Sequence, residues 1–146
     1  MSIEQLTRNK NAESNSSPLS RASAPITSDA VDMELLNAFQ ELQLDDGSDL
    51  IVELIDLYLQ EMPRRVTEIR EASIATEWVL LKRAAHNLKG SSANLGVRYV
   101  AETCEKLERL NSYDSPQVVA ALIQLLEYES AMARSALAAE RQRRLD

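Results

Sequence analysis

The chain has little of what a disulfide-linked, strand-rich or membrane-spanning protein needs. Its 146 residues include one cysteine, one histidine, one phenylalanine, one tryptophan, three glycines and four prolines. A single cysteine excludes an internal disulfide and is compatible with a reducing cytoplasm. The scarcity of glycine and proline argues against a fold of many strands joined by tight turns. The longest apolar run, residues 118–123, is far shorter than the ~20 residues of a membrane helix.

The charge is mainly of one sign. Asp and Glu number 23 against 16 Lys and Arg, so the net charge is −7. General nucleic-acid binding needs a basic surface and is not expected. The basic cluster at 141–144 is interpreted as a solvated helix end. The N-terminus, Met-Ser-Ile-Glu-Gln, has no basic start followed by an apolar segment, so a secretory signal is not expected.

What the chain does contain is helix-forming sequence. Ala, Leu and Glu dominate, and apolar residues recur at helical spacing over most of the chain. Residues 1–28 are polar without any period, and we expect a disordered leader there. For residues 29–142 we predict an all-α domain, an up-and-down antiparallel four-helix bundle with a short extra N-terminal helix. Short connections between the helices favour antiparallel neighbours.

Capping residues and prolines indicate the boundaries of the first two helices. A short helix is expected over about residues 28–43. Ser48 is placed to cap the next helix. That helix is expected to continue to about Ala72 as a single helix kinked at Pro63, because the apolar stripe continues beyond the proline.

The last three helices are bounded in the same way. Thr76 is expected to cap a helix that ends at about 93–94, and Gly96 marks the boundary with the next helix. Ser115 followed by Pro116 predicts the start of the last helix. Seven of its residues are expected to be buried: Val118, Val119, Leu122, Leu125, Leu126, Met132 and Ala136.

The single histidine, His86, lies on the wrong side of its helix to belong to the core. On a wheel of about 100° per residue, the core-facing residues fall within about 60° of Leu88. These are Leu81, Ala84, Ala85, Leu88, Ser92 and Leu95. His86 falls about 160° from Leu88, so its imidazole is expected in solvent. A neutral, exposed imidazole is a competent nucleophile near neutral pH.

The neighbours of His86 suit a reaction with a phosphoryl group. Lys82 and Lys89 lie one turn before and one turn after it, where ammonium groups would balance added negative charge. Gly90 costs the helix about 1 kcal/mol relative to alanine, and no turn explains it. A glycine on this face leaves space for another protein's reactive group. Close packing of a neighbouring helix against Gly90 is the alternative.

Glu108, on the following helix, is the candidate orienting group for His86. It lies about 40° from Cys104, inside the apolar sector of its helix. Its carboxylate could accept a hydrogen bond from the imidazole Nδ1–H, which would fix the tautomer and leave Nε2 free to attack. An acidic residue near a frayed helix end is the other interpretation.

The pattern resembles the histidine-containing phosphotransfer (Hpt) domain of bacterial and eukaryotic phosphorelays. His86, Lys89, Gly90 and Gly96 match the family's spacing at all four positions, and the resemblance spans about residues 30–140. It implies a phosphoryl carrier in which His86 accepts the group from an aspartyl phosphate of one response-regulator receiver domain and passes it to another. Lys89 would neutralise charge, and Gly90 would leave steric access.

The same resemblance implies that the chain has no nucleotide-dependent kinase activity. No GxGxxG or Walker A motif is present. A hybrid sensor histidine kinase and response regulators would be the partners. No cofactor is expected on this chain, and Mg²⁺ would belong to the receiver domain. A cytoplasmic monomer with no membrane or nucleic-acid partner is the expectation.

The partner surface is expected around His86. Val79 is an apolar residue about 20° from His86 on the wheel, and Ala93 is a small one. Lys82, Arg83 and Lys89 surround them, which would suit an acidic receiver pocket. Val79 could instead be covered by the N-terminal leader.

Three other functions compete with phosphotransfer. A hydrolase is disfavoured because Ser91 and Ser92 are poorly placed to act with His86 and a single histidine excludes multi-histidine metal sites. A sensor-kinase dimerisation hairpin would normally show a proline soon after the histidine, and none is present. A helical interaction module that binds receiver domains or other signalling proteins without phosphorylation remains the main alternative.

Overall fold

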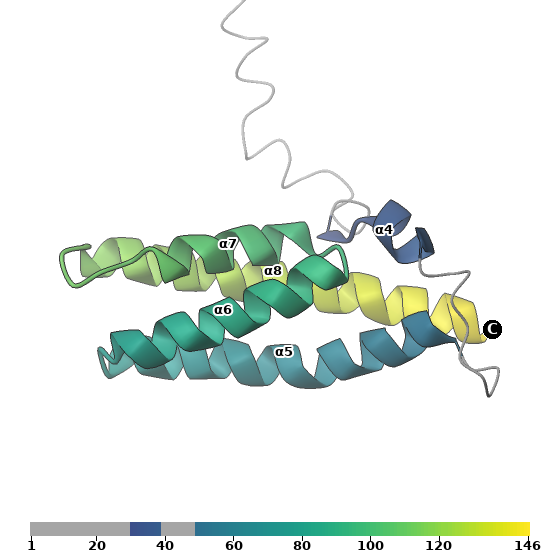
Figure 1. Ribbon diagram of the computed structural model, residues 1–146, viewed down its shortest axis with the longest axis horizontal. Helices are drawn as coiled ribbons and strands as arrows, with labels where there is room; N and C mark the ends of the chain where they lie inside the picture. The colour runs from purple at the N-terminus through teal and green to yellow at the C-terminus, as the bar shows by residue number, and fades with distance from the viewer. Residues whose placement is uncertain (1–29, 39–48) are drawn as a thin grey trace, which may run out of the picture.

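The computed structural model describes residues 30–38 and 49–146, and these are helical almost throughout (Figure 1). The helices are α4 (Met33–Ala38), α5 (Leu50–Ile74), α6 (Trp78–Asn94), α7 (Arg98–Glu108) and α8 (Pro116–Leu145). The prediction of an all-α four-helix bundle with a short extra helix before it is confirmed. Helix α8 ends beyond the boundary expected at residue 142, and residues 1–28 lie outside the described residues.

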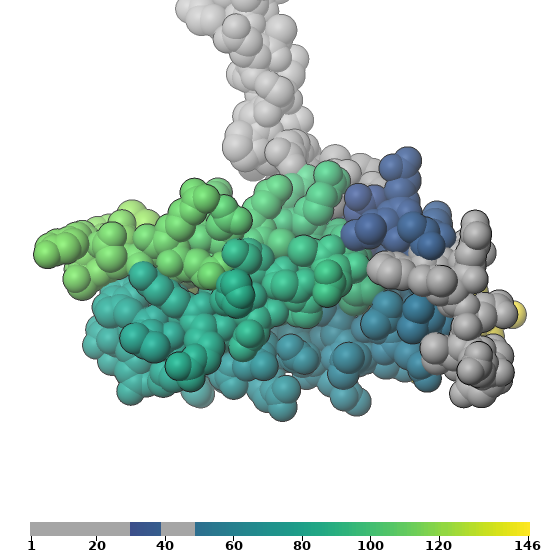
Figure 2. All heavy atoms as spheres, in the orientation of Figure 1, coloured from purple at the N-terminus to yellow at the C-terminus, as the bar shows by residue number. Residues whose placement is uncertain are grey.

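Each long helix packs against two others and lies diagonal to the third. Substantial contacts join α5 to α6, α6 to α7, α7 to α8 and α8 back to α5. On the face shown in Figure 2, the surfaces of α5, α6 and α7 adjoin one another. Helices α6 and α8 therefore occupy opposite corners of the bundle, and α8 runs nearly its whole length (Figure 1). Within the described residues, no helix is both long and apolar enough to cross a membrane.

The first helices begin at other residues than expected. The predicted 28–43 helix is interrupted at Val31 and Asp32, and α4 spans Met33–Ala38, because Asp32 Oδ1 accepts from the backbone N–H groups of Glu34 and Leu35 and starts α4 there. The N-cap of α5 is Asp49 and not Ser48, since Asp49 accepts from Ile51 N at 2.8 Å. Helix α5 continues through Pro63 as one element.

The cap predicted for α6 was also wrong, whereas the cap of α8 is confirmed. Thr76 has a positive φ of 52° and its hydroxyl donates to the carbonyl of Ala75, so it makes no cap; Glu77 takes the N-cap position without a side-chain bond. Ser115 caps α8 by accepting from Val118 N, with Pro116 in the first turn.

The core lies where the wheel of α6 placed it, but the prediction for α8 was partly wrong. Leu81, Ala84, Ala85, Leu88, Ser92 and Leu95 are all buried. On α8, Val119 and Leu126 are buried and Leu122, Met132 and Ala136 are partly buried, whereas Val118 and Leu125 are exposed. The apolar residues of α8 therefore extend around more of the helix than the other bundle helices cover.

The basic C-terminal cluster is not a simple solvated helix end. Arg144 is largely buried and pairs with the buried Glu140 at 2.7 Å, and it reaches Asp49 at the start of α5. A second arginine, Arg141, pairs with Asp56 of α5. These contacts fasten the end of α8 to the first half of α5.

The turn between α6 and α7 is fixed by the segment before α4. Gly96 has φ +77°, a left-handed conformation that favours glycine. Its carbonyl accepts from Asp32 N at 2.8 Å, and Ala30 and Val31 are buried in the core beside it. This contact holds the end of α6 and the start of α7 in place.

Candidate functional site

His86 lies on the outer face of α6 with its side chain 66% exposed. The opposite face of α6 is buried, and there Tyr58 of α5 and Ser92 share a hydrogen bond of 2.7 Å between their hydroxyl oxygens. This buried bond fixes the rotation of α6 about its axis, because rotating the helix would leave two buried hydroxyl groups without a hydrogen-bond partner. The imidazole is therefore held toward solvent on the side of α7.

Glu108, the last residue of α7, bridges His86 and Lys89. The Nδ1–H of His86 donates to Glu108 Oε2 at 2.9 Å. The Nζ of Lys89 lies 2.6 Å from the other carboxylate oxygen, Oε1. The hydrogen bond expected between His86 and Glu108 is present. Glu108 is therefore more than an acidic residue near a frayed helix end. Sequence reasoning missed that the same carboxylate also holds Lys89.

The charges of this cluster follow from its contacts. Partial burial raises the pKa of Glu108, but the contacts with Lys89 and His86 outweigh burial, and its pKa lies below the usual range. The same contact with Glu108 raises the pKa of Lys89. At neutral pH the ionised carboxylate of Glu108 therefore faces Nδ1 of His86, and it can only accept a hydrogen bond. The proton of a neutral ring then lies on Nδ1, which leaves the lone pair on Nε2.

Gly90 lies on the exposed face one turn beyond His86, with open space around it. Among the residues that the structure describes, a Cβ built on Gly90 would meet no atom within 4 Å outside its own helix turn. The alternative that a neighbouring helix packs closely on Gly90 is therefore wrong. Nothing in the packing of α6 explains why the chain accepts a glycine there, at a cost of about 1 kcal/mol relative to alanine.

The residues predicted for partner contact share the exposed face of α6. Val79 is 70% exposed, and Arg83 and Ala93 are also exposed. Lys82 is partly exposed, and within the described part of the chain it makes no ion pair that would join it to the cluster at Glu108. Of the two lysines expected to flank His86, the structure brings only Lys89 into contact with the cluster.

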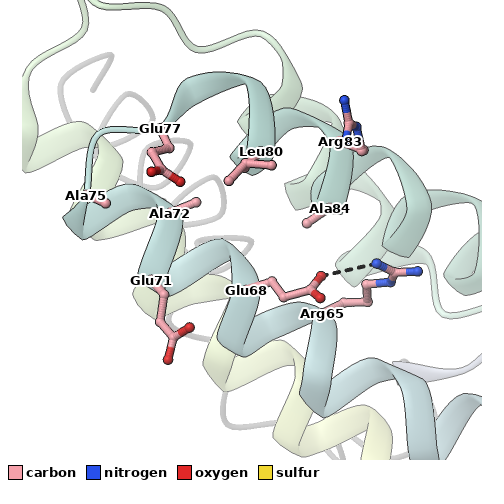
Figure 3. Close-up of a pocket in the computed structure, with 9 residues that line it drawn as sticks. All are labelled: Arg65, Glu68, Glu71, Ala72, Ala75, Glu77, Leu80, Arg83 and Ala84. Atoms are coloured by element: carbon pink, nitrogen blue, oxygen red, sulfur yellow. Dashed lines mark hydrogen bonds and ion pairs between the residues drawn. The ribbon is translucent and has the colours of Figure 1, made fainter.

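A shallow groove of about 500 Å³ adjoins this face between α5 and α6 (Figure 3). Arg83 lies at its rim, Leu80 and Ala84 line it from α6, and Glu68 lines it from α5. Sequence reasoning did not single out Leu80, whose wheel position beside the core gave no signal of a groove. The groove beside Arg83 is therefore lined by both apolar and charged side chains, with Glu71 and Glu77 among them.

The comparison with known families agrees with this geometry. The Hpt domain family matches residues 53–140, which include parts of all four bundle helices and the whole His86 cluster. The chain belongs to the Hpt domain family.

One solved structure carries the likeness over nearly its whole length. It is that of histidine-containing phosphotransfer protein B (HptB) from Pseudomonas aeruginosa PAO1, with 29% sequence identity and a TM-score of 0.65. The match covers 83% of this chain and 98% of that chain. A search of curated protein sequences found no match to this chain.

Proposed function

We propose that the protein is a phosphorelay intermediate that carries a phosphoryl group on Nε2 of His86. The group would come from an aspartyl phosphate of one response-regulator receiver domain and pass to an aspartate of another, with a hybrid sensor histidine kinase upstream. The observation that carries the proposal is the hydrogen bond from His86 Nδ1 to Glu108, which leaves Nε2 exposed on a chain of the Hpt family.

The transfer step follows from that bond. The Nε2 lone pair attacks phosphorus, the N–P bond forms, and the P–O bond to the receiver's aspartate breaks with its electron pair remaining on the carboxylate. The ring keeps its Nδ1 proton and gains positive charge as the new bond forms. Glu108, 2.9 Å away, stabilises that charge. The reverse sequence delivers the group to the next receiver.

Lys89 is the residue that meets the negative charge of the phosphoryl group. Glu108 holds its ammonium group 2.6 Å away while the site is empty. A phosphoryl group on Nε2 brings a second anion near Lys89, and the long lysine side chain can turn toward it. Glu108 thus keeps the counter-charge close to His86 before the phosphoryl group arrives.

The surface around His86 is proposed as the docking site for receiver domains. Val79 and Ala93 would contact the receiver, and Lys82 and Arg83 would face its acidic pocket. Any Mg²⁺ that assists the transfer is proposed to belong to the receiver domain, and this chain is proposed to bring no cofactor and no kinase activity of its own. The proposed setting is the cytoplasm, as the family resemblance implies.

A binding module without phosphotransfer remains the second candidate, but two features of α6 count against it. Gly90 costs helix stability, and no described residue packs on it. The carboxylate of Glu108 orients a histidine whose reactive nitrogen is exposed. A surface used only for binding would gain from an alanine at residue 90.

The chain's single histidine makes the test direct. A receiver domain carrying labelled aspartyl phosphate is incubated with the wild type, with His86→Gln, and with Asn87→Gln as a control on the neighbouring exposed residue. We expect acid-labile, base-stable label on the wild type and on Asn87→Gln, and none on His86→Gln. Label that persists on His86→Gln contradicts the proposal. Receiver binding without any transfer to the wild type favours the binding module.

A further inference from the structure

A second ion pair lies beside the His86 cluster on α7. Arg109, the residue after Glu108, donates from Nη2 to Oε2 of Glu105 at 2.6 Å. Glu105 precedes Glu108 by three residues, so it lies about 60° around α7 from Glu108 and roughly 4.5 Å nearer the start of the helix. Two carboxylates one turn apart therefore lie on the same side of α7.

Glu105 lies opposite Lys89, as Glu108 lies opposite His86. Helices α6 and α7 pack against each other and run antiparallel about the turn at residues 95–97 (Figure 1). Lys89 follows His86 by three residues and Glu105 precedes Glu108 by three, so the two pairs span the helices at matching heights. The Nζ of Lys89 nevertheless reaches back to Glu108, 2.6 Å away, and not to the carboxylate at its own height.

Both charges of the second pair act on Lys89. Its pKa is raised chiefly by the hydrogen bond to Glu108; the carboxylate of Glu105 raises this pKa further, and the guanidinium of Arg109 lowers it. The two groups are therefore near enough to attract and to repel the ammonium group. Lysine carries its charge on a flexible four-carbon stem, so Lys89 can turn from one carboxylate to the other.

Arg109 explains why Lys89 bonds Glu108. A glutamate four residues before a basic residue is the favourable order for an ion pair on a helix. Arg109 therefore occupies Glu105, and its charge repels a second cation from that carboxylate. We infer that the Glu105–Arg109 pair positions Lys89 beside His86, away from the carboxylate opposite it. This role rests on the proposed function, in which the Lys89 ammonium group meets the phosphoryl group on His86.

The second pair is exposed, which limits the size of its effect. The side chains of Arg109 and Glu105 are 76% and 48% exposed, and an exposed pair on a helix shifts an equilibrium by about twofold. We therefore expect its loss to slow phosphoryl transfer by about twofold to threefold at low ionic strength, which is less than the loss of Glu108. In 1 M salt, where charges are screened beyond about 3 Å, we expect this difference to disappear.

Single-turnover transfer from a phosphorylated receiver domain, at rising receiver concentration and low ionic strength, tests the positioning. Arg109→Gln is expected to lower the maximum rate about twofold to threefold and to leave the half-saturating concentration unchanged, whereas Arg109→Lys, which keeps a partner for Glu105, stays close to the wild type. The control Lys106→Gln removes the same charge from an exposed residue of α7 that acts on Glu129 of α8, and it is expected to transfer as the wild type does. Circular dichroism confirms that each variant is folded. An unchanged maximum rate in Arg109→Gln, or a change in the half-saturating concentration alone, overturns the inference.

The double variant Arg109→Gln with Glu105→Gln separates positioning from direct contact. Removal of Glu105 takes away the competing carboxylate, so Lys89 returns to Glu108 and the maximum rate is expected to recover. If Arg109 contacts the phosphoryl group itself, the double variant stays as slow as Arg109→Gln, and that result overturns the inference. The same recovery is expected with phosphoramidate as the donor, since this small molecule does not need to dock on the helices.

NMR of the unphosphorylated protein shows directly which carboxylate holds Lys89. A scalar coupling across the hydrogen bond joins Lys89 Nζ to the carboxyl carbon of its partner. We expect coupling to Glu108 alone in the wild type, and to both Glu105 and Glu108 in Arg109→Gln. Coupling to Glu108 alone in both proteins overturns the inference. Because this measurement needs no phosphoryl group, it decides the position of Lys89 even where transfer to His86 fails and the proposed function is wrong.

Discussion

Gly90 in the last turns of α6 and Gly96 in the turn after it lie six residues apart, and their surroundings differ. A Cβ on Gly96 would come within 2.9 Å of Asp32 Cβ and 3.0 Å of Asp32 O, and its φ is +77°. A Cβ on Gly90 would meet no atom within 4 Å from the rest of the described chain outside its own helix turn. The fold requires glycine at 96, where two segments of chain touch. The fold does not require glycine at residue 90. There, we attribute the glycine to the proposed approach of a partner protein to His86.

Gly96→Ala gives the largest effect on stability. The left-handed conformation costs an ordinary residue about 1–2 kcal/mol, and the contact with Asp32 adds to it. We expect a loss of about 2–4 kcal/mol in the free energy of unfolding, measured by denaturant titration. Gly96→Asn, which tolerates this φ but keeps a Cβ, is the control and is expected to lose less. Full wild-type stability of Gly96→Ala contradicts this explanation of the turn.

Gly90 substitutions are expected to act in the opposite sense. Gly90→Ala should raise the free energy of unfolding by about 0.5–1 kcal/mol, because alanine is the better helix former. Gly90→Gln should slow phosphoryl transfer from a receiver domain tenfold or more by filling the space beside His86. Phosphoramidate, a small phosphoryl donor, serves as the control and should be less affected. Unchanged transfer from the receiver in Gly90→Gln removes steric access as the reason for the glycine.

Two carboxylates, Glu108 at the end of α7 and Glu129 on the adjacent α8, extend the comparison to charged groups. Glu129 of α8 accepts from the Thr103 hydroxyl at 2.5 Å, and burial chiefly raises its pKa to about 7. The folded state therefore holds a proton that the unfolded state has lost, and stability falls as pH rises from about 4.5 to about 7. We expect Glu129→Gln to stabilise the protein by about 1–2 kcal/mol at pH 8 and to have little effect at pH 4. Thermal unfolding at both pH values measures this.

Glu108→Gln is expected to change function more than stability. The amide oxygen can still accept from Nδ1–H of His86, but it neither balances the charge of the phosphorylated ring nor holds Lys89 by an ion pair. We expect transfer from a receiver domain to slow by about threefold to tenfold, less than 1.4 kcal/mol, with a small change in unfolding temperature. Stopped-flow or quench kinetics measure the rate. If phosphoryl transfer is slower in Glu129→Gln than in Glu108→Gln, the functional role given to Glu108 is wrong.

The sequence predicts the parts of the molecule that depend on helical period. The buried residues of α6, the exposure of His86 and the reach of Glu108 all follow from angles around one or two helices. These are local properties, since 3.6 residues per turn decides which side chains share a face. The Hpt pattern adds the spacing of Lys89 and Gly90.

The remaining features depend on contacts between segments far apart in the chain. Asp49 and not Ser48 caps α5, and it is also reached by Arg144 from the far end of α8. The exposure of Val118 and Leu125 depends on which side of α8 faces the bundle, and the periodicity of its apolar residues alone does not decide this. The groove beside Arg83 requires α5 and α6 to be placed together.

The central claim is that Glu108 holds Nδ1 of His86 and leaves Nε2 to receive the phosphoryl group. Phosphorus and nitrogen NMR of the protein, labelled with ¹⁵N-histidine and phosphorylated by a receiver domain, identifies the nitrogen bonded to phosphorus. With one histidine in the chain, the spectrum has a single assignment. We predict phosphorus on Nε2 and a proton retained on Nδ1. Phosphorus on Nδ1, or no phosphohistidine, contradicts the account.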